Sequence, residues 1–206
     1  MSLPSEQHPR TLRWEGDPSG SLFLIDQTLL PSQLLEIECR SVEDVWQAIK
    51  RLAVRGAPAI GCAAAYGVVI AAQADAASSA ALLDKIIESA RYLASSRPTA
   101  VNLFWALDRV VAVAQARFDA GATGAEIVDA LAAEAERMRT EDSETCRKIG
   151  AVGAALLADG ATVLTHCNAG GLATAEYGTA LAPVYAACEA GKRVAVYADE
   201  TRPLLQ

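Results

Sequence analysis

Residues 11–40 alternate between short apolar and short polar stretches, which is the period of β-strands with one buried face. The apolar stretches are TLRWE, SLFLIDQTLL and LLEIEC, and the turn-forming cluster GDPSGS separates the first two. This part of the chain is therefore predicted to form a small β-meander or hairpin.

From Ser41 onward the apolar spacing changes to that of helices. Ser41 and Asp44 form a capping-box pattern, which predicts a helix to about Ala53. Pro58 is placed to open a second helix that runs to about Asp75. The apolar run of that helix is rich in alanine and glycine, so we interpret it as a buried core helix and not as a membrane span.

A proline separates the next two helices. Residues 81–96 carry an amphipathic pattern that ends before Pro98. Thr99 is the expected N-cap of the following helix, and Gly121 is expected to end it.

A second capping box, formed by Thr123 and Glu126, begins a long helical pattern with an expected interruption near residues 140–143. The chain is therefore predicted to contain two domains. Residues 1–142 are expected to form a β-meander and a helical domain, and residues 143–206 the beginning of a parallel α/β domain.

Beyond Gly160 the pattern becomes strand, helix, strand. The runs ATVLTHC (161–167) and KRVAVYADE (192–200) are typical of strands, and residues 173–190 are typical of a helix. Such a βαβ unit has parallel strands, and ligands bind where parallel strands end. Both runs end in polar residues, so we predict a site at that shared edge. Two strands are too few for a domain, and we expect the chain to be a fragment or one product of a split gene.

Composition narrows the class of protein. The 206 residues are 52% hydrophobic with a net charge of −7, and no cluster of lysines and arginines is interleaved with aromatic residues. Binding to nucleic acid is therefore not expected. The N-terminal stretch MSLPSEQHPR lacks the apolar core of a signal peptide, so we expect a cytoplasmic protein that does not bind membranes.

Five cysteines and two histidines lack the spacing of a disulfide framework or of a zinc site, so free thiols and no metal are expected. Cys167 lies between His166 and an expected helix N-terminus, both of which favour a reactive thiol. The residues alone leave open whether Cys167 is functional or is a small core side chain. The remaining cysteines are expected to be structural: Cys39, Cys62, Cys146 and Cys188.

Arg55 and Arg97 each stand at a helix break that contains a proline. A planar guanidinium in a loop suits a phosphate. A surface arginine that caps a helix end has the same sequence pattern, and the residues alone do not distinguish the two.

Four segments carry motifs in a fixed order: RGAPAIGCAAAYG (55–67), RPTAVNLFWALDR (97–109), LTHCNAGGLATAEYGTAL (164–181) and VYADETRPLLQ (196–206). Together they resemble the methylthioribose-1-phosphate isomerase family, over nearly the whole chain. This family is related to the regulatory subunits of translation initiation factor 2B and to ribose-1,5-bisphosphate isomerase.

The resemblance implies a fold with a small β segment, a helical N-terminal domain and a Rossmann-like C-terminal domain. It implies a first substrate-binding loop, a second substrate contact, a catalytic cysteine and a substrate-binding glutamine. The family's catalytic aspartate and an Asn-Lys pair would lie beyond the last residue of this chain. The resemblance places the first substrate-binding loop at Arg55, Gly56 and Ala57 and the second substrate contact at Arg97. It implies that Cys167 is the catalytic cysteine and Gln206 the substrate-binding glutamine.

The activity implied by the resemblance is the aldose–ketose isomerisation of S-methyl-5-thioribose 1-phosphate in methionine salvage, without a metal or an organic cofactor. The alternatives are a ribose-1,5-bisphosphate isomerase and a non-catalytic regulatory subunit like those of initiation factor 2B. The expected partners are the sugar phosphate and either a second copy of the chain or the missing C-terminal half. With only part of the site, the chain alone is expected to be inactive.

Overall fold

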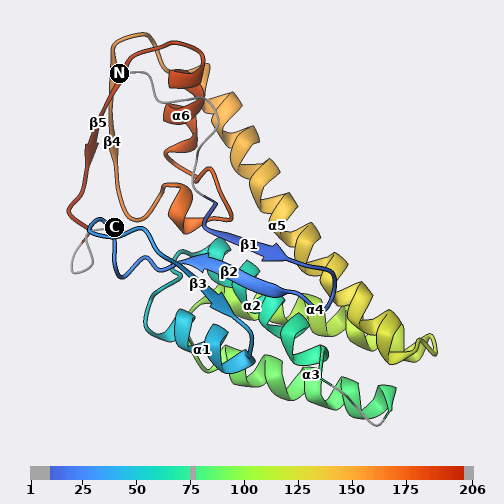
Figure 1. Cartoon of the computed structure of the whole chain (residues 1–206). Coiled ribbons are helices and arrows are strands. Elements are labelled where there is room, and N and C mark those ends of the chain that lie inside the picture. The colour runs from blue at the N-terminus through green and yellow to red at the C-terminus, as the bar shows by residue number, and fades with distance from the viewer. Residues whose placement is uncertain (1–9, 75–77, 202–206) are drawn as a thin grey trace.

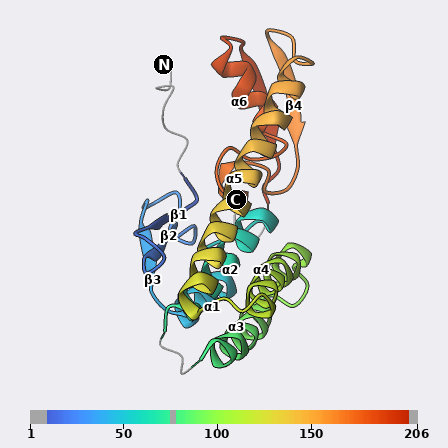
Figure 2. The same cartoon turned by 90° about the vertical axis from the view of Figure 1, so that its right-hand side faces the viewer.

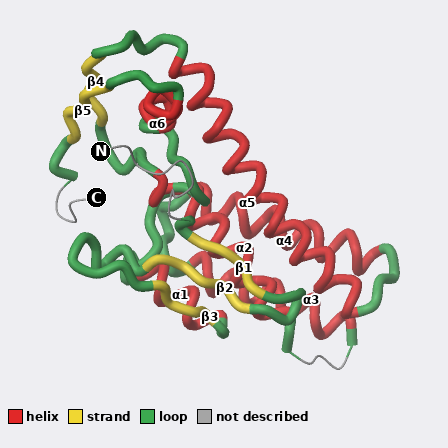
Figure 3. Tube along the Cα trace, turned by 45° about the horizontal axis from the view of Figure 1, so that its top comes forward, coloured by secondary structure: helices red, strands yellow, loops and turns green. Residues whose placement is uncertain are grey.

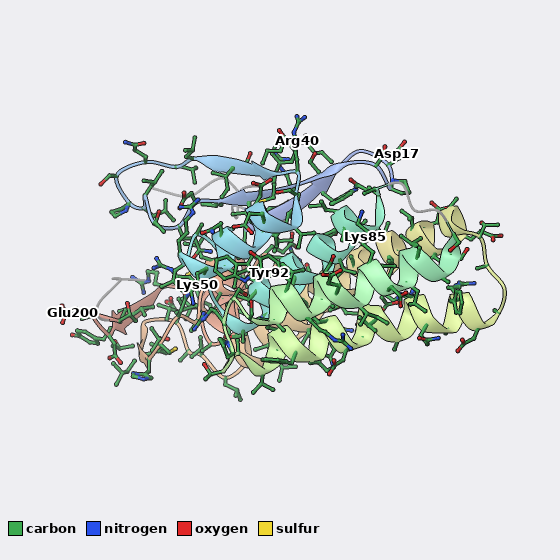
Figure 4. All side chains as sticks on the ribbon, turned by 90° about the horizontal axis from the view of Figure 1, so that it is seen from below. Asp17, Arg40, Lys50, Lys85, Tyr92 and Glu200 are labelled. Carbon is green, nitrogen blue, oxygen red and sulfur yellow. The ribbon has the colours of Figure 1, made fainter. Side chains whose placement is uncertain are left out.

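The computed structural model of the protein describes residues 10–74 and 78–201. Three antiparallel strands, β1 (Leu12–Glu15), β2 (Ser21–Ile25) and β3 (Glu36–Cys39), form a sheet in the order β1-β2-β3, which confirms the predicted meander. Leu22 and Leu24 of β2 are fully buried, because alternate side chains of this sheet face the helices. Figure 4 shows the sheet as one layer over the helical layer.

The helical layer contains five helices: α1 (Val42–Lys50), α2 (Ala57–Ala72), α3 (Ser79–Ala94), α4 (Val101–Asp119) and α5 (Gly124–Ala154). Helix α2 lies in the centre and contacts the other four, and all its residues from Ala59 to Ala72 are buried. Small side chains let its neighbours approach closely: a Cβ at Gly61 would lie 3.2 Å from the backbone oxygen of Asn102. The apolar run is therefore a core helix, as predicted. Within the described residues no helix is long and apolar enough to cross a membrane.

The caps of the helices follow the sequence with one exception. Both capping boxes, at Ser41 and at Thr123, are present. Gly121, with a φ of +78°, follows the end of α4 as predicted. The prediction of Thr99 as an N-cap is wrong. Thr99 lies inside a tight turn, and α4 begins after Ala100, which has no side-chain cap.

Helix α5 is continuous over 31 residues, so the interruption predicted near residues 140–143 is wrong. Thr140, Asp142 and Ser143 are weak helix formers, so contacts with neighbouring elements decide the conformation of this stretch. Glu141 accepts a 2.7 Å hydrogen bond from Arg109 of α4, and Ser143 donates to Glu176. Helix α5 thus extends from the helical layer to the α/β part, as Figures 1 and 2 show. The boundary between residues 142 and 143 falls within this helix, and the division into two domains stays a prediction.

The last part of the described chain is a parallel βαβ unit. Strands β4 (Ala161–Thr165) and β5 (Val194–Ala198) pair in parallel, as predicted, and α6 (Ala182–Glu189) lies between them in sequence (Figure 3). The prediction of a helix from residue 173 is wrong. Only the short 3-10 helix η1 (Gly171–Ala173) precedes an irregular stretch in which Tyr177 and Gly178 have positive φ values of 82° and 85°. The chain is a mixed α/β fold of the expected class.

Candidate functional site

Arg55 is a buried cation in the connection between α1 and α2, with only 5% of its surface exposed. Its Nε donates to Gln27 Oε1 (3.2 Å) and its Nη2 donates to the backbone oxygen of Gln27 (3.3 Å). Burial lowers the pKa of Arg55, and no carboxylate in the described part of the chain forms an ion pair with it. Because proteins rarely leave a buried charge without a counter-charge, this environment favours an anionic ligand.

The next residues form the start of α2. Gly56 is its N-cap, with a φ of +102° and no side-chain hydrogen bond to the first turn. Ala57 is exposed. The N–H groups at such a helix start carry partial positive charge and bind phosphate oxygens well. A buried arginine beside an uncapped helix start is thus a corner suited to an anion.

This corner touches the segment that follows Cys167. A Cβ at Gly56 would lie only 2.3 Å from the Cα of Ala173 and 2.4 Å from its backbone oxygen. The absence of a side chain at Gly56 therefore allows two backbones to meet. The fold brings the predicted first substrate-binding loop against η1, although more than a hundred residues separate them in sequence.

Cys167 lies at the carboxyl end of β4, where its side chain is exposed and its φ is +65°. The helix N-terminus expected beside this thiol is not there, because only the three-residue η1 follows and α6 begins at Ala182. The preceding residue, His166, is hydrogen-bonded through Nδ1 to Asp199, which follows β5. The polar ends of the two parallel strands therefore share one edge, as predicted.

Two buried polar atoms flank Cys167 without a partner. Neither Thr165 Oγ1 nor Asn168 Nδ2 has a hydrogen-bond partner among the described residues. Buried polar atoms in native proteins are nearly always paired. Their position indicates that a ligand, or further protein, completes the end of β4.

The remaining predicted site residues are Arg97 and Gln206. Arg97 is half-buried in the turn before α4, and its side chain has no hydrogen bond or ion pair with the described part of the chain. Gln206 lies outside the described residues. A pocket of about 230 Å³ opens between α2, α4 and α5. It is lined by Pro58, Asn102 and Asp142 among others, which places it just after both predicted substrate-binding segments.

Sequence reasoning missed two residues of this region, Gln27 and Asp142. Asp142 Oδ2 accepts a 2.7 Å hydrogen bond from the backbone N–H of Ala175 and so holds the irregular stretch after η1. The sequence predicts a helix break near residues 140–143, so Asp142 is not predicted as a residue of this site. The polar DQT run directly after an apolar strand was an available signal for Gln27.

Replacing Asp142 with asparagine is expected to stabilise the protein near neutral pH. Burial, with a smaller contribution from Glu176, raises the pKa of Asp142 above its ordinary value of 3.8, so ionisation of this carboxyl disfavours the folded state. The asparagine keeps an oxygen that accepts from Ala175 but carries no charge. The gain in unfolding free energy should therefore grow as the pH rises above 3.8 and level off above the raised pKa.

Urea unfolding across that pH range measures this gain. Asp129→Asn, at an exposed aspartate on the same helix, is the control for the loss of one negative charge. Equal curves for Asp142→Asn and the unchanged protein would contradict the expected cost of the buried charge.

The remaining cysteines divide into two groups. Cys39, Cys62 and Cys146 are buried, and burial raises the pKa of the first two thiols to about 12 and of the third to about 11. They are core side chains, as expected. Cys188 is exposed, so its expected place in the core is wrong. Over residues 10–74 and 78–201, no group of three His, Cys, Asp or Glu side chains could hold a metal ion.

These observations define a class of protein: a helical layer with a β-meander, followed by a parallel α/β unit with a polar site at its strand ends. The chain belongs to the initiation factor 2 subunit family, whose sequence profile matches residues 53–206.

Two relatives are named as sugar 1-phosphate isomerases. The 5-deoxyribose 1-phosphate isomerase of Moorella thermoacetica is 57% identical over 189 residues, which are 91% of this chain and 53% of the relative. The methylthioribose-1-phosphate isomerase of Rhodopirellula baltica is 49% identical over 202 residues, which are 95% of this chain and 56% of the relative. The chain thus spans about half the length of these relatives.

Two solved structures have the same fold. The 5-methylthioribose 1-phosphate isomerase of Pyrococcus horikoshii matches with a TM-score of 0.88 and 38% identity, over 96% of this chain and 54% of that chain. The translation initiation factor eIF-2B subunit delta of A. fulgidus matches with a TM-score of 0.84 and 47% identity, over 96% of this chain and 56% of that chain.

Proposed function

We propose that this chain supplies part of the active site of an aldose–ketose isomerase that acts on a ribose 1-phosphate modified at carbon 5. The buried guanidinium of Arg55 carries the proposal. It has no carboxylate partner in the described part of the chain, and it directly precedes the uncapped start of α2. A phosphate fits this corner in charge and in hydrogen-bonding geometry. Relatives with known names that share this segment act on sugar 1-phosphates.

In the proposed reaction the phosphate stays on carbon 1. Carbon 2 is oxidised to a ketone while carbon 1 is reduced. The bond between carbon 1 and the ring oxygen breaks, the hydrogen of carbon 2 moves to carbon 1, and the proton of the 2-hydroxyl ends on the former ring oxygen, so no external oxidant is needed. Arg55 and the N–H groups of Gly56 and Ala57 anchor the phosphate, and Arg97 and Gln206 make further contacts. Cys167 takes up or returns the proton that moves at the reacting carbons.

Methylthioribose 1-phosphate is the proposed substrate, and 5-deoxyribose 1-phosphate is the closest competitor. Relatives of both names match this chain at about half identity or more. The two sugars differ only at carbon 5, away from the reacting carbons. The anion-binding corner and Cys167 serve both substrates equally, so the choice between them lies with the groups around carbon 5.

A regulatory subunit is the second candidate, because a structure that is 47% identical carries the name of an initiation factor subunit. Such a subunit requires neither turnover nor a reactive thiol at the end of β4. The two candidates therefore differ in a measurable way. The isomerase is favoured by the exposed Cys167, which lies between two buried polar atoms that have no partner within residues 10–74 and 78–201.

Turnover should appear only when the chain is combined with the segment of the Moorella thermoacetica relative that it does not match. We expect the two pieces to associate and to convert methylthioribose 1-phosphate, which NMR of the sugar product measures. Arg55→Gln should abolish most of this turnover, because the phosphate loses its buried cation. Arg40→Gln, at an exposed arginine on the sheet side of the molecule (Figure 4), is the matched control and should not change it.

Turnover by the chain alone would show that the catalytic acid lies within these residues. Association of the two pieces without turnover of either sugar phosphate would overturn the proposed isomerase and favour the regulatory subunit.

A further inference from the structure

Gln27 is a polar residue with only 1% of its surface exposed. It is the second residue after the end of β2. Its backbone N–H donates to Ala53 (2.9 Å). Its side-chain oxygen and its backbone oxygen both accept from Arg55, and its Nε2 donates to the backbone oxygen of Leu172 (2.8 Å). One buried amide thus joins the start of the anion corner to η1.

The surroundings of Gln27 hold both ends of this link in place. Asp26 accepts a 2.8 Å hydrogen bond from Arg51, which fixes the start of the loop. Thr11, which directly precedes β1, is fully buried. It donates through Oγ1 to the backbone oxygen of Gly171 (2.8 Å) and through its N–H to the backbone oxygen of Ala175. The β-meander segment therefore contacts the turn after Cys167 through several hydrogen bonds, and Gln27 links these contacts to Arg55.

The choice of an amide at this position has a chemical consequence. A glutamate would accept from Arg55 equally well, but it would neutralise the guanidinium and could not donate to Leu172. An apolar side chain would remove the contact to Arg55 Nε and leave only the backbone oxygen of residue 27 as an acceptor for the guanidinium. Glutamine aims the cation while leaving its positive charge available to a ligand.

We propose that Gln27 is a positioning residue that fixes the direction of the Arg55 guanidinium and ties it to the turn that follows Cys167. This inference rests on the proposed function of the same site. It assigns a role in the site to the N-terminal meander, which lies before the residues 53–206 matched by the family profile. The anionic group that Arg55 binds is the phosphate of the substrate.

The experiment compares two substitutions at Gln27 with one at a matched glutamine. Gln73 also uses its side-chain N–H groups to bridge backbone oxygens, those of Pro18 and Gly20 (2.9 Å each), but at the far end of the sheet from the site. The variants are Gln27→Glu, Gln27→Ala and Gln73→Ala. Binding of inorganic phosphate to the full chain, measured by calorimetry, is the first readout, because it does not depend on turnover.

Gln27→Glu is expected to weaken phosphate binding by at least about tenfold near neutral pH, because the new carboxylate neutralises Arg55. Lowering the pH should restore binding as that carboxyl becomes protonated, which a merely structural defect would not show. Gln27→Ala should weaken binding at every pH, and Gln73→Ala should leave it unchanged. In the combined enzyme, Gln27→Glu should raise KM more than it lowers kcat.

Phosphate binding by Gln27→Glu equal to that of the unchanged chain would overturn the inference, as would an equal loss in Gln73→Ala. Absence of Arg55-dependent phosphate binding in the unchanged chain would overturn both the inference and the anion corner. Normal phosphate effects without turnover in the combined enzyme would retain the role of Gln27 and reject only the isomerase.

Discussion

Cys167→Ser is expected to lower kcat of the combined enzyme by roughly two to four orders of magnitude, the range that proton transfer by a positioned side chain contributes. Cys167 stands at the carboxyl end of β4, exposed, between two buried polar atoms that lack partners in the described part of the chain. A serine fits the same space but is a far poorer acid and base. The KM for the sugar phosphate should change little, since Arg55 and not the thiol anchors the phosphate.

Folding stability separates this loss from a structural defect. Because the Cys167 side chain is exposed, its replacement removes no core packing, and the unfolding free energy in urea should stay unchanged. Cys188→Ser, at the other exposed cysteine, is the matched control for thiol loss and should keep full turnover. Normal turnover by Cys167→Ser would remove Cys167 from the chemistry.

Gly56→Ala should have the largest effect on the structure of the site. Alanine adopts the backbone conformation of Gly56, with φ +102° and ψ 136°, only at a cost of about 1–3 kcal/mol, and its Cβ would also lie 2.3 Å from the Cα of Ala173. The loop and η1 therefore have to separate, and the unfolding free energy should fall by about 3 kcal/mol or more. Phosphate binding should be lost with it, because the start of α2 moves away from the turn after Cys167.

Gly121→Ala isolates the backbone part of this cost. Gly121 also has a positive φ, of +78°, but a Cβ there meets no atom within 4 Å. We expect a loss of only about 1 kcal/mol and unchanged phosphate binding, measured by urea unfolding and calorimetry. If both substitutions destabilise the protein equally, the contact between Gly56 and Ala173 contributes nothing.

The effects expected for Cys167→Ser and Gly56→Ala concern the same proposed site. The resemblance of four motifs singled out Arg55, Gly56 and Cys167 from the sequence, and the fold brings Gly56 against Ala173 of η1, six residues after Cys167. Each residue is proposed to have a separate measurable role: charge for Arg55, close backbone approach for Gly56, and reactivity for Cys167.

The sequence by itself determined the features that depend on neighbours within three or four residues, or on a simple period. The capping boxes at Ser41 and Thr123 are local hydrogen bonds between residues three apart, and the structure confirms both. The alternation before Cys39 and the βαβ pattern after Gly160 likewise correspond to the antiparallel meander and the parallel pair.

Only the tertiary structure decided features that depend on distant partners. Helix α5 stays continuous through residues 140–143 because Arg109 and Glu176 pair with its polar side chains, and neither is a sequence neighbour. The stretch after η1 is not helical because Gly178 packs against the backbone of Gly170 with a positive φ. Gln27 reaches Leu172 across 145 positions, a contact that no local pattern encodes. Local hydrogen bonds and hydrophobic periods depend on residues that are close in sequence. A buried hydrogen bond between distant residues forms only when the folded chain brings them together.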